Sequence, residues 1–147
     1  MATREELYAV LIPVHGDTLL LPNATVAEVL SADGLEPVGR GSRVGVRDWN
    51  GKRLRVVSFE ILNGGEGPAD SGRARIVVLH PLAGAPTDSA CGILTQGYPH
   101  LLTLNRVALV KAPLRDSDAP GVVLARVRIA NTEALIPNLE AIQQAAS

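Results

Sequence analysis

The stretch that decides the fold is Gly45-Val46-Arg47-Asp48-Trp49-Asn50-Gly51-Lys52-Arg53-Leu54-Arg55-Val56-Val57-Ser58-Phe59-Glu60. At its centre stands Asn50-Gly51, the pair that suits a type I′ turn, because both central residues of that turn need a positive φ. The turn separates two apolar segments, 44–49 and 52–59, so we predict a β-hairpin. In the second segment Leu54 and Val56 alternate with arginines, which predicts one buried face and one face in water.

The rest of the chain repeats this pattern of short apolar segments between turns. Segment 7–14 is apolar on both alternating faces, which is typical of a strand covered on both sides. Segment 26–30 fits either a helical turn or an extended segment. Further strands are predicted at 18–21, 76–79, 92–95, 101–104, 107–110 and 122–129, with loops at 63–72, 81–88 and 112–121. Many short strands predict a mostly β fold of small barrels.

Segment 122–129 has the same alternation as the second arm of the hairpin. Val123, Ala125, Val127 and Ile129 alternate with Arg126 and Arg128, so we expect both arginines to face water.

The C-terminal end alone has helical spacing. Pro137 can occupy the first turn of a helix, and Leu139, Ile142 and Ala146 follow on one face. About ten residues are too few to hold a helix in water, so we expect this one to pack on the barrels.

The composition fits a single domain, 1–147. Hydrophobic residues make up 46% of the 147 residues but aromatics only 3%, so the core is built from aliphatic side chains, which suit packed strands. A net charge of −1 argues against nucleic acid as the partner of the whole protein. The start of the chain has no signal sequence, and the longest apolar run, 7–14, is too short to insert into a membrane. The lone Cys91 fits a reducing compartment, so we expect a cytoplasmic protein.

No pattern of catalytic or metal-binding residues is present. His15, His80 and His100 fall in turns or at strand ends without metal-ligand spacing. Cys91 opens an apolar strand, which favours a buried structural cysteine over a nucleophile. We therefore expect no enzyme activity, no cofactor and no metal.

One segment, 40–55, is strongly basic, with six cations against the single acid Asp48 and a local net charge of +5. Such charges can simply keep a hairpin edge in water. They can also bind an acidic protein partner or nucleic acid, and the scarcity of aromatic residues disfavours single-stranded nucleic acid. Trp49, beside the turn, either packs into the core or is an exposed interface anchor.

The hairpin stretch resembles the signature of CheW-like domains. Three other stretches resemble segments of the same family in the same order: Val26 to Leu30, Ile76 to Leu79 and Cys91 to Thr95. The resemblance extends from Leu7 to Ile142. It implies two small packed five-stranded SH3-like barrels, sub-barrels 18–85 and 86–147, with strand 7–14 between them.

The resemblance also implies a non-catalytic adaptor that links a methyl-accepting chemoreceptor to the regulatory domain of a CheA-like histidine kinase. The kinase would be held through apolar barrel ends and the receptor in a groove on the first barrel. The alternative is a small β-barrel binding module for another ligand outside signalling. The implied partner-binding residues are Val26, Glu28, Arg47, Trp49, Asn50, Arg53 and Arg55.

Three positions differ from the family pattern. Asn50 stands where the family has an Arg tied to receptor coupling, Ser58 where it has Asp, and Arg55 where it has Pro. The runs Asp48-Trp49-Asn50-Gly51 and Ser58-Phe59-Glu60 are similar to the ChpC-type adaptor of chemosensory pili systems, which implies a role in pilus or twitching motility.

Overall fold

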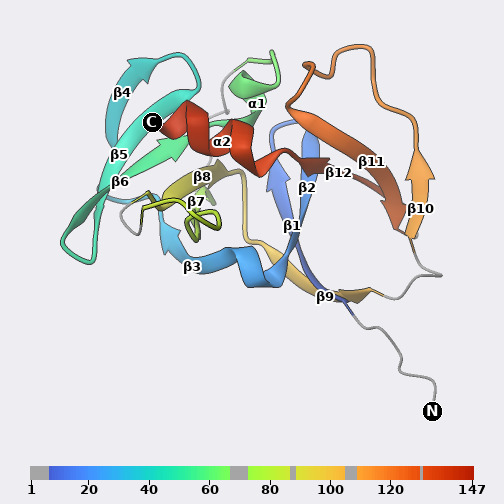
Figure 1. Cartoon of the computed structure of the whole chain (residues 1–147), viewed down its shortest axis with the longest axis horizontal. Coiled ribbons are helices and arrows are strands. Elements are labelled where there is room, and N and C mark those ends of the chain that lie inside the picture. Colours follow the sequence, from blue (N-terminus) through green and yellow to red (C-terminus); the bar gives the residue numbers. More distant parts are fainter. Residues whose placement is uncertain (1–6, 67–72, 87–88, 105–108, 130) are drawn as a thin grey trace.

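The structure, a computed structural model, describes residues 7–66, 73–86, 89–104, 109–129 and 131–147. Two six-stranded sheets hold most of them (Figure 1). The first, which we call the terminal sheet, has the strand order β10 (Leu109–Ala112), β11 (Val123–Ile129), β12 (Thr132–Pro137), β2 (Asp17–Pro22), β1 (Leu7–Val14), β9 (His100–Leu104). The second, the middle sheet, has the order β3 (Val26–Ser31), β7 (Arg75–Leu79), β8 (Cys91–Thr95), β6 (Lys52–Val57), β5 (Arg43–Trp49), β4 (Glu36–Arg40).

The predicted hairpin is confirmed as β5 and β6. Trp49 pairs with Lys52 across the turn, and the central residues Asn50 and Gly51 have φ values of 50° and 75°. The second arm ends at Val57, earlier than predicted. Ser58 ends it because its Oγ accepts a hydrogen bond from the Ile61 N–H at 3.3 Å and so caps a short helix, α1 (Phe59–Leu62).

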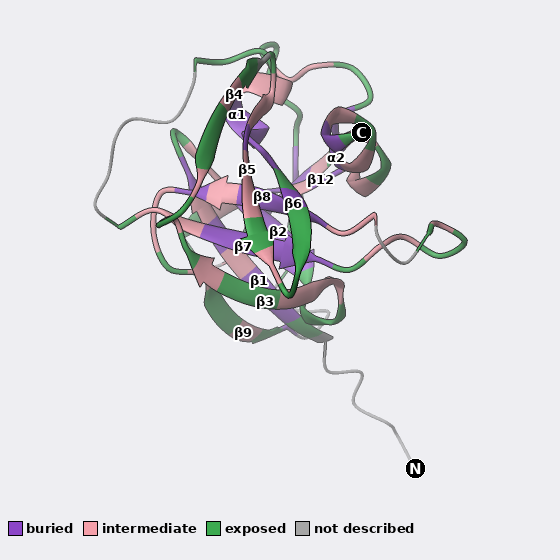
Figure 2. Cartoon of the chain, turned by 90° about the vertical axis from the view of Figure 1, so that its left-hand side faces the viewer, coloured by how far each residue is buried: buried purple, intermediate pink, exposed green. Residues whose placement is uncertain are grey.

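Successive side chains of a strand point to opposite faces of the sheet, so along the inner strands they enter different cores. On β1, Val10, Ile12 and Val14 enter a central core, whereas Ala9 enters a smaller core of the terminal sheet. The prediction that 7–14 is covered on both faces is confirmed from Ala9 onward, while Tyr8 is exposed. In Figure 2 buried residues mark β7 and β8, and exposed residues mark the outer strands β4 and β9.

Three hydrophobic cores therefore hold the molecule together. The terminal sheet encloses Ala9, Leu20, Leu104, Val127 and Ala134. The middle sheet encloses Leu54, Val56, Ile76 and Val78. The central core joins the two sheets and takes Phe59 from α1 and Ile142 and Ala146 from a C-terminal helix, α2 (Leu139–Ala146), which lies across the junction in Figure 1. The predicted mostly β fold of two packed SH3-like barrels with a short C-terminal helix is confirmed, with six strands in each sheet in place of five.

Several local predictions need correction. The strands β4 and β12 were not predicted, and segment 26–30 is extended, as β3. Pro137 does not open the helix. It ends β12, and the side chain of Asn138 caps α2 by accepting a hydrogen bond from the Glu140 N–H at 3.1 Å.

The boundaries of other predicted segments also changed. The strand predicted at 107–110 is β10, which begins at Leu109; residues 107–108 lie outside the described part, as do 67–72 and 87–88 of the two predicted loops. The division into 18–85 and 86–147 also differs from the sheets at two strands. β2 stays with β1 as a hairpin, and β8 pairs in parallel with β6.

A short 3-10 turn, η1 (Asn23–Thr25), joins the sheets between β2 and β3. Among the described residues no helix has the length and hydropathy that a membrane span requires.

Candidate functional site

The predicted binding residues gather at the hairpin and on β3. The indole Nε1 of Trp49 donates a hydrogen bond to Oε2 of Glu28 at 2.7 Å, although the two residues are 21 positions apart. The Trp49 ring packs partly against the core of the middle sheet. Trp49 is thus intermediate between a core residue and an exposed one, with a partly packed ring and an indole N–H that bonds at the surface. Val26, at the start of β3, is half-buried against the central core, whereas Glu28 is exposed.

The tip of the hairpin is fixed mainly by backbone geometry. Asn50 is exposed and occupies the left-handed region that the turn requires. Arg47 is tied to its surroundings, since its Nε donates to the Asp33 carbonyl at 2.9 Å and its Nη1 to the Asp48 carbonyl at 3.0 Å. The side chain of Arg47 therefore braces the hairpin against the turn between β3 and β4.

The basic cluster is less positive than its sequence indicates. Arg53 donates hydrogen bonds to Glu36 on β4 and to Asp48, the latter at 2.9 Å. These bonds, the one to Glu36 first, raise the pKa of Arg53 above its usual range. Glu36 precedes the segment over which the charge was counted, so its neutralising effect was missed. Arg55, by contrast, is exposed and forms no ion pair with any described residue.

Exposed apolar side chains form a rim beside β3 that the sequence did not single out. Leu101 on β9 pairs with Val10, and Val29 on β3 pairs with Val77. Directly opposed residues share a face of the sheet, and both Val10 and Val77 belong to the central core. Leu101 and Val29 therefore lie on the same faces of their sheets as these core residues, but at outer strands, where both are exposed.

Further exposed apolar side chains belong to the edge strand β10, to its neighbour β11 and to the segment that follows β10. Val110 on β10 and Leu124 on β11 are each about 60% exposed, and Leu114 follows β10 in the chain. Large exposed apolar side chains that lie close together commonly mark protein interfaces. We call these three residues the β10–β11 patch.

Arg126 is the largest departure from the predicted pattern. Its side chain is 1% exposed, and it forms paired hydrogen bonds with Asp118 at 2.6 and 2.7 Å and with Asp17 at 2.8 and 3.1 Å. The loop before β11 folds over the sheet and brings Asp118 onto the arginine. The hydrogen bonds from Arg126 hold the pKa of Asp118 well below its usual range.

This ionic cluster also links the two sheets. Asn63, the C-cap of α1, donates to Asp118 at 3.2 Å and accepts from the Ala119 N–H at 2.7 Å. The alternation of β11 gave no sign of this arrangement, because both acids come from other segments.

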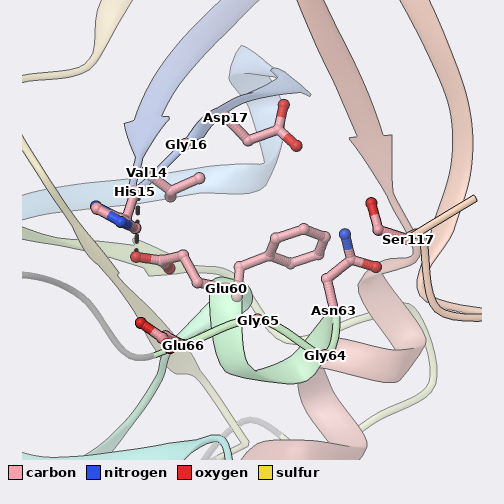
Figure 3. A pocket seen from close by; sticks show the side chains of 11 residues that line it. Val14, His15, Gly16, Asp17, Glu60, Asn63, Gly64, Gly65, Glu66 and Ser117 are labelled. Carbon is pink, nitrogen blue, oxygen red and sulfur yellow. Dashed lines mark hydrogen bonds between the residues drawn. The ribbon is translucent and has the colours of Figure 1, made fainter. Parts of the chain in front are cut away.

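The Ser58-Phe59-Glu60 run has a structural role. Phe59 is buried in the central core, and the buried Glu60 carboxylate accepts bonds from the His15 backbone N–H at 3.1 Å and from Ser58 Oγ at 3.3 Å. Figure 3 shows Glu60 beneath the β1–β2 turn, in a cleft of about 180 Å³. Because the donor is the backbone of His15, Glu60 anchors the turn and does not form an acid–base pair with the imidazole.

The one cysteine, a residue type that can act as a nucleophile, also has a structural role. Cys91 is buried in the central core, and burial raises the pKa of its thiol to about 11, which disfavours the nucleophilic thiolate. Within the described ranges no three metal-ligating side chains stand together.

A two-barrel fold with surface patches and a basic hairpin is what the sequence resemblance led us to expect. The model of the CheW-like domain matches residues 9–147, which is almost the whole chain. The chain belongs to the CheW-like domain family. Members of this family are non-catalytic scaffolds of chemotaxis that interact with chemoreceptors and with CheA kinases.

Solved structures of the family share this CheW-like fold. The scaffolding protein TtCheW from Thermoanaerobacter tengcongensis superposes with a TM-score of 0.72 at 14% sequence identity. The match covers 89% of this chain and 88% of TtCheW, so the fold is similar over most of both chains. No curated protein matches the chain significantly in sequence.

Proposed function

We propose that this CheW-like protein is a cytoplasmic chemosensory adaptor that links a chemoreceptor to the regulatory domain of a CheA-like histidine kinase. The observation that carries the proposal is the family match over residues 9–147. The exposed surfaces support it, since an adaptor needs at least two places where other proteins bind.

We assign the receptor to the side of the molecule that holds β3 and the hairpin. Glu28, Trp49 and Asn50 present polar groups there, and Val29 adds an exposed apolar side chain. The Trp49–Glu28 hydrogen bond fixes the hairpin relative to β3, so it preorganises this surface for a partner.

The kinase regulatory domain is assigned to the β10–β11 patch. This patch lies on the terminal sheet, whereas the hairpin and β3 belong to the middle sheet, so both partners can bind at once. An interface of standard size buries about 1,600 Å² in total, which a patch of this kind can nucleate.

We further propose that the protein belongs to the ChpC-type adaptors of pilus systems. The support is the sequence of the hairpin tip and of Ser58-Phe59-Glu60, whose residues the fold uses for the Trp49–Glu28 bond and for the cap of α1. Deletion of the gene should reduce twitching on agar and leave swimming unchanged. Loss of swimming alone would remove the pilus assignment.

Calorimetry with the two purified partners tests the adaptor proposal. Leu124→Ala combined with Val110→Ala should weaken binding of the kinase regulatory domain at least about tenfold, since each truncation removes about 1 kcal/mol of apolar contact. Trp49→Phe keeps an aromatic ring at this position but removes the indole N–H that donates to Glu28. It should weaken receptor binding several-fold and leave kinase binding unchanged. Absence of binding of either partner to the unmodified chain at tens of micromolar would refute the proposal.

A further inference from the structure

A cleft of about 540 Å³ opens beside the second arm of the hairpin. Three elements line it, namely β6, the segment at Ser89 and the C-terminal end of α2, which lies beside β6 in Figure 1. We call it the basic cleft; the lining residues that matter below are Lys52, Arg53, Arg55, Ser89, Gln143 and Ala146. Its volume falls within the range of roughly 300–1,000 Å³ typical of ligand sites.

The charge in this cleft is positive and partly uncompensated. Among the described residues its lining includes three cationic side chains of β6 and no aspartate or glutamate, whereas Asp88, next to Ser89 in the chain, lies outside the described residues. Arg53 is matched by Glu36 and Asp48. Lys52 and Arg55 are exposed and make no ion pair with the described residues. Two positive charges thus face the cleft without an ion-pair partner among the residues that the structure describes.

The other walls offer neutral groups suited to a peptide. Ser89 and Gln143 line the cleft with polar side chains that also bond within the chain: Ser89 Oγ donates to the Pro86 carbonyl at 2.5 Å, and Gln143 accepts from the Leu82 N–H at 3.4 Å and donates to the Ser89 carbonyl at 3.5 Å. Ser89 Oγ and Gln143 Oε1 can each accept a further bond, and Ala146 supplies an apolar surface. The end of α2 does not need these cations, because Ser147 donates through its Oγ to the Gln143 carbonyl at 3.0 Å and through its N–H to the Gln144 carbonyl at 3.2 Å. Lys52 and Arg55 remain available for a ligand.

We propose that the basic cleft binds an acidic peptide segment of a partner protein. Carboxylates of the segment would pair with Lys52 and Arg55, and an arginine can hold a carboxylate through two parallel hydrogen bonds. Backbone amides of the segment would meet Ser89 and Gln143. This inference concerns the chemistry of the occupant. The cleft uses the second arm of the hairpin whose tip is assigned to the receptor, but Glu28, Trp49 and Asn50 are not among the described residues that line it.

Nucleic acid is the less favoured polyanion. The lining contains no aromatic side chain on which a base can stack, and the whole chain has a net charge of −1. A carboxylate-bearing peptide needs neither a stacking surface nor a wide positive field.

The test uses the full chain and a fluorescein-labelled peptide of about ten residues in which Glu alternates with Ala. Fluorescence anisotropy should give a Kd on the order of 100 µM at low salt, weakening as salt is raised. The same peptide with Gln for Glu should not bind. Amide NMR shifts on peptide addition should centre on Ser89, Gln143 and Ala146.

Matched charge reversals locate the site. Lys52→Glu combined with Arg55→Glu should weaken binding of the peptide at least about tenfold. The control, Lys111→Glu with Arg128→Glu, makes the same change of charge on exposed residues of β10 and β11 and should have little effect. The proposal would be overturned if both pairs of substitutions reduced peptide affinity equally, or if the unmodified chain did not bind the peptide. It would also be overturned if the NMR shifts centred elsewhere, or if a single-stranded DNA of equal charge bound more tightly than the peptide. If the first pair unfolds, the NMR map on the unmodified chain still decides.

Discussion

Two arginines of this protein each donate hydrogen bonds to two carboxylates, but in opposite surroundings; Arg126 also has Glu133 at 3.9 Å. Arg126, on the terminal sheet, is 1% exposed and lies between Asp17 and Asp118. Arg53, on the middle sheet, is 53% exposed and lies between Glu36 and Asp48. Both belong to strands in which arginine alternates with apolar residues.

The difference teaches that burial, more than the number of ion pairs, determines what a charged cluster does. Around Arg126 water is largely excluded, so the loss of one partner would leave buried charges uncompensated. Around Arg53 water solvates each group and screens the attraction, so the same contacts contribute little to stability. The buried cluster is therefore structural, whereas the exposed one contributes little to the stability of the fold.

The largest expected effect comes from Arg126→Met. It removes the cation and leaves the carboxylates of Asp17 and Asp118 in a site with little access to water, so the free energy of unfolding should fall by about 3–5 kcal/mol. Urea denaturation measures it. The control is Arg128→Met, an exposed neighbour on β11, which should change stability by less than about 0.5 kcal/mol. Similar losses for the two variants would erase the contrast between buried and exposed arginines.

The next effect concerns Asp118 and pH. Because the folded-state pKa of Asp118 is lowered, its ionised form stabilises the fold above the unfolded pKa of about 4, and this stability is lost as pH falls below that value. Asp118→Asn should cost about 1.5–3 kcal/mol at pH 7. The substitution should also reduce the loss of stability below about pH 4, which is the acid limb of the curve of stability against pH.

Urea midpoints measured at pH 7 and at steps below pH 4 provide the comparison. Asp116→Asn, an exposed acid in the same loop, is the matched control and should retain the acid limb. An unchanged acid limb in Asp118→Asn would place the acid sensitivity elsewhere.

A third test asks what holds the hairpin that carries Arg53. Gly51 has a φ of 75°, which strains a β-branched residue, so Gly51→Val should destabilise the protein by about 1–3 kcal/mol. A thermal melt records the loss. A melting temperature within about one degree of the unmodified protein would mean that the turn does not set the register of β5 and β6.

The smallest effect is expected for Arg53→Ala. Its two partners are exposed and water screens the attraction, so the free energy of unfolding should fall only slightly, and less still in high salt. Denaturation in about 0.1 M and about 1 M NaCl separates the charge effect from packing. A loss that rivals Arg126→Met and persists in high salt would show that the exposed cluster is structural too.

The sequence alone determined the elements whose signals are local. Asn50-Gly51 predicted the turn because few residues accept positive φ, and the two-sided apolar run at 7–14 predicted a strand between two cores. The family signature along the chain predicted the two-barrel fold. The helix of Leu139, Ile142 and Ala146 was predicted by its spacing, although its start was placed too early, because the Asn138 cap is a stronger signal than Pro137.

Only the tertiary structure decided the features that join distant segments. It buried Arg126, since Asp17 and Asp118 arrive from a turn and a loop that sequence spacing does not relate to β11. It paired Trp49 with Glu28, and it set Glu36 beside Arg53, which removed part of the predicted positive charge. The physical reason is the same in each case: strand periodicity states which face a residue takes, but the charge and burial of that face depend on what the rest of the chain packs against it.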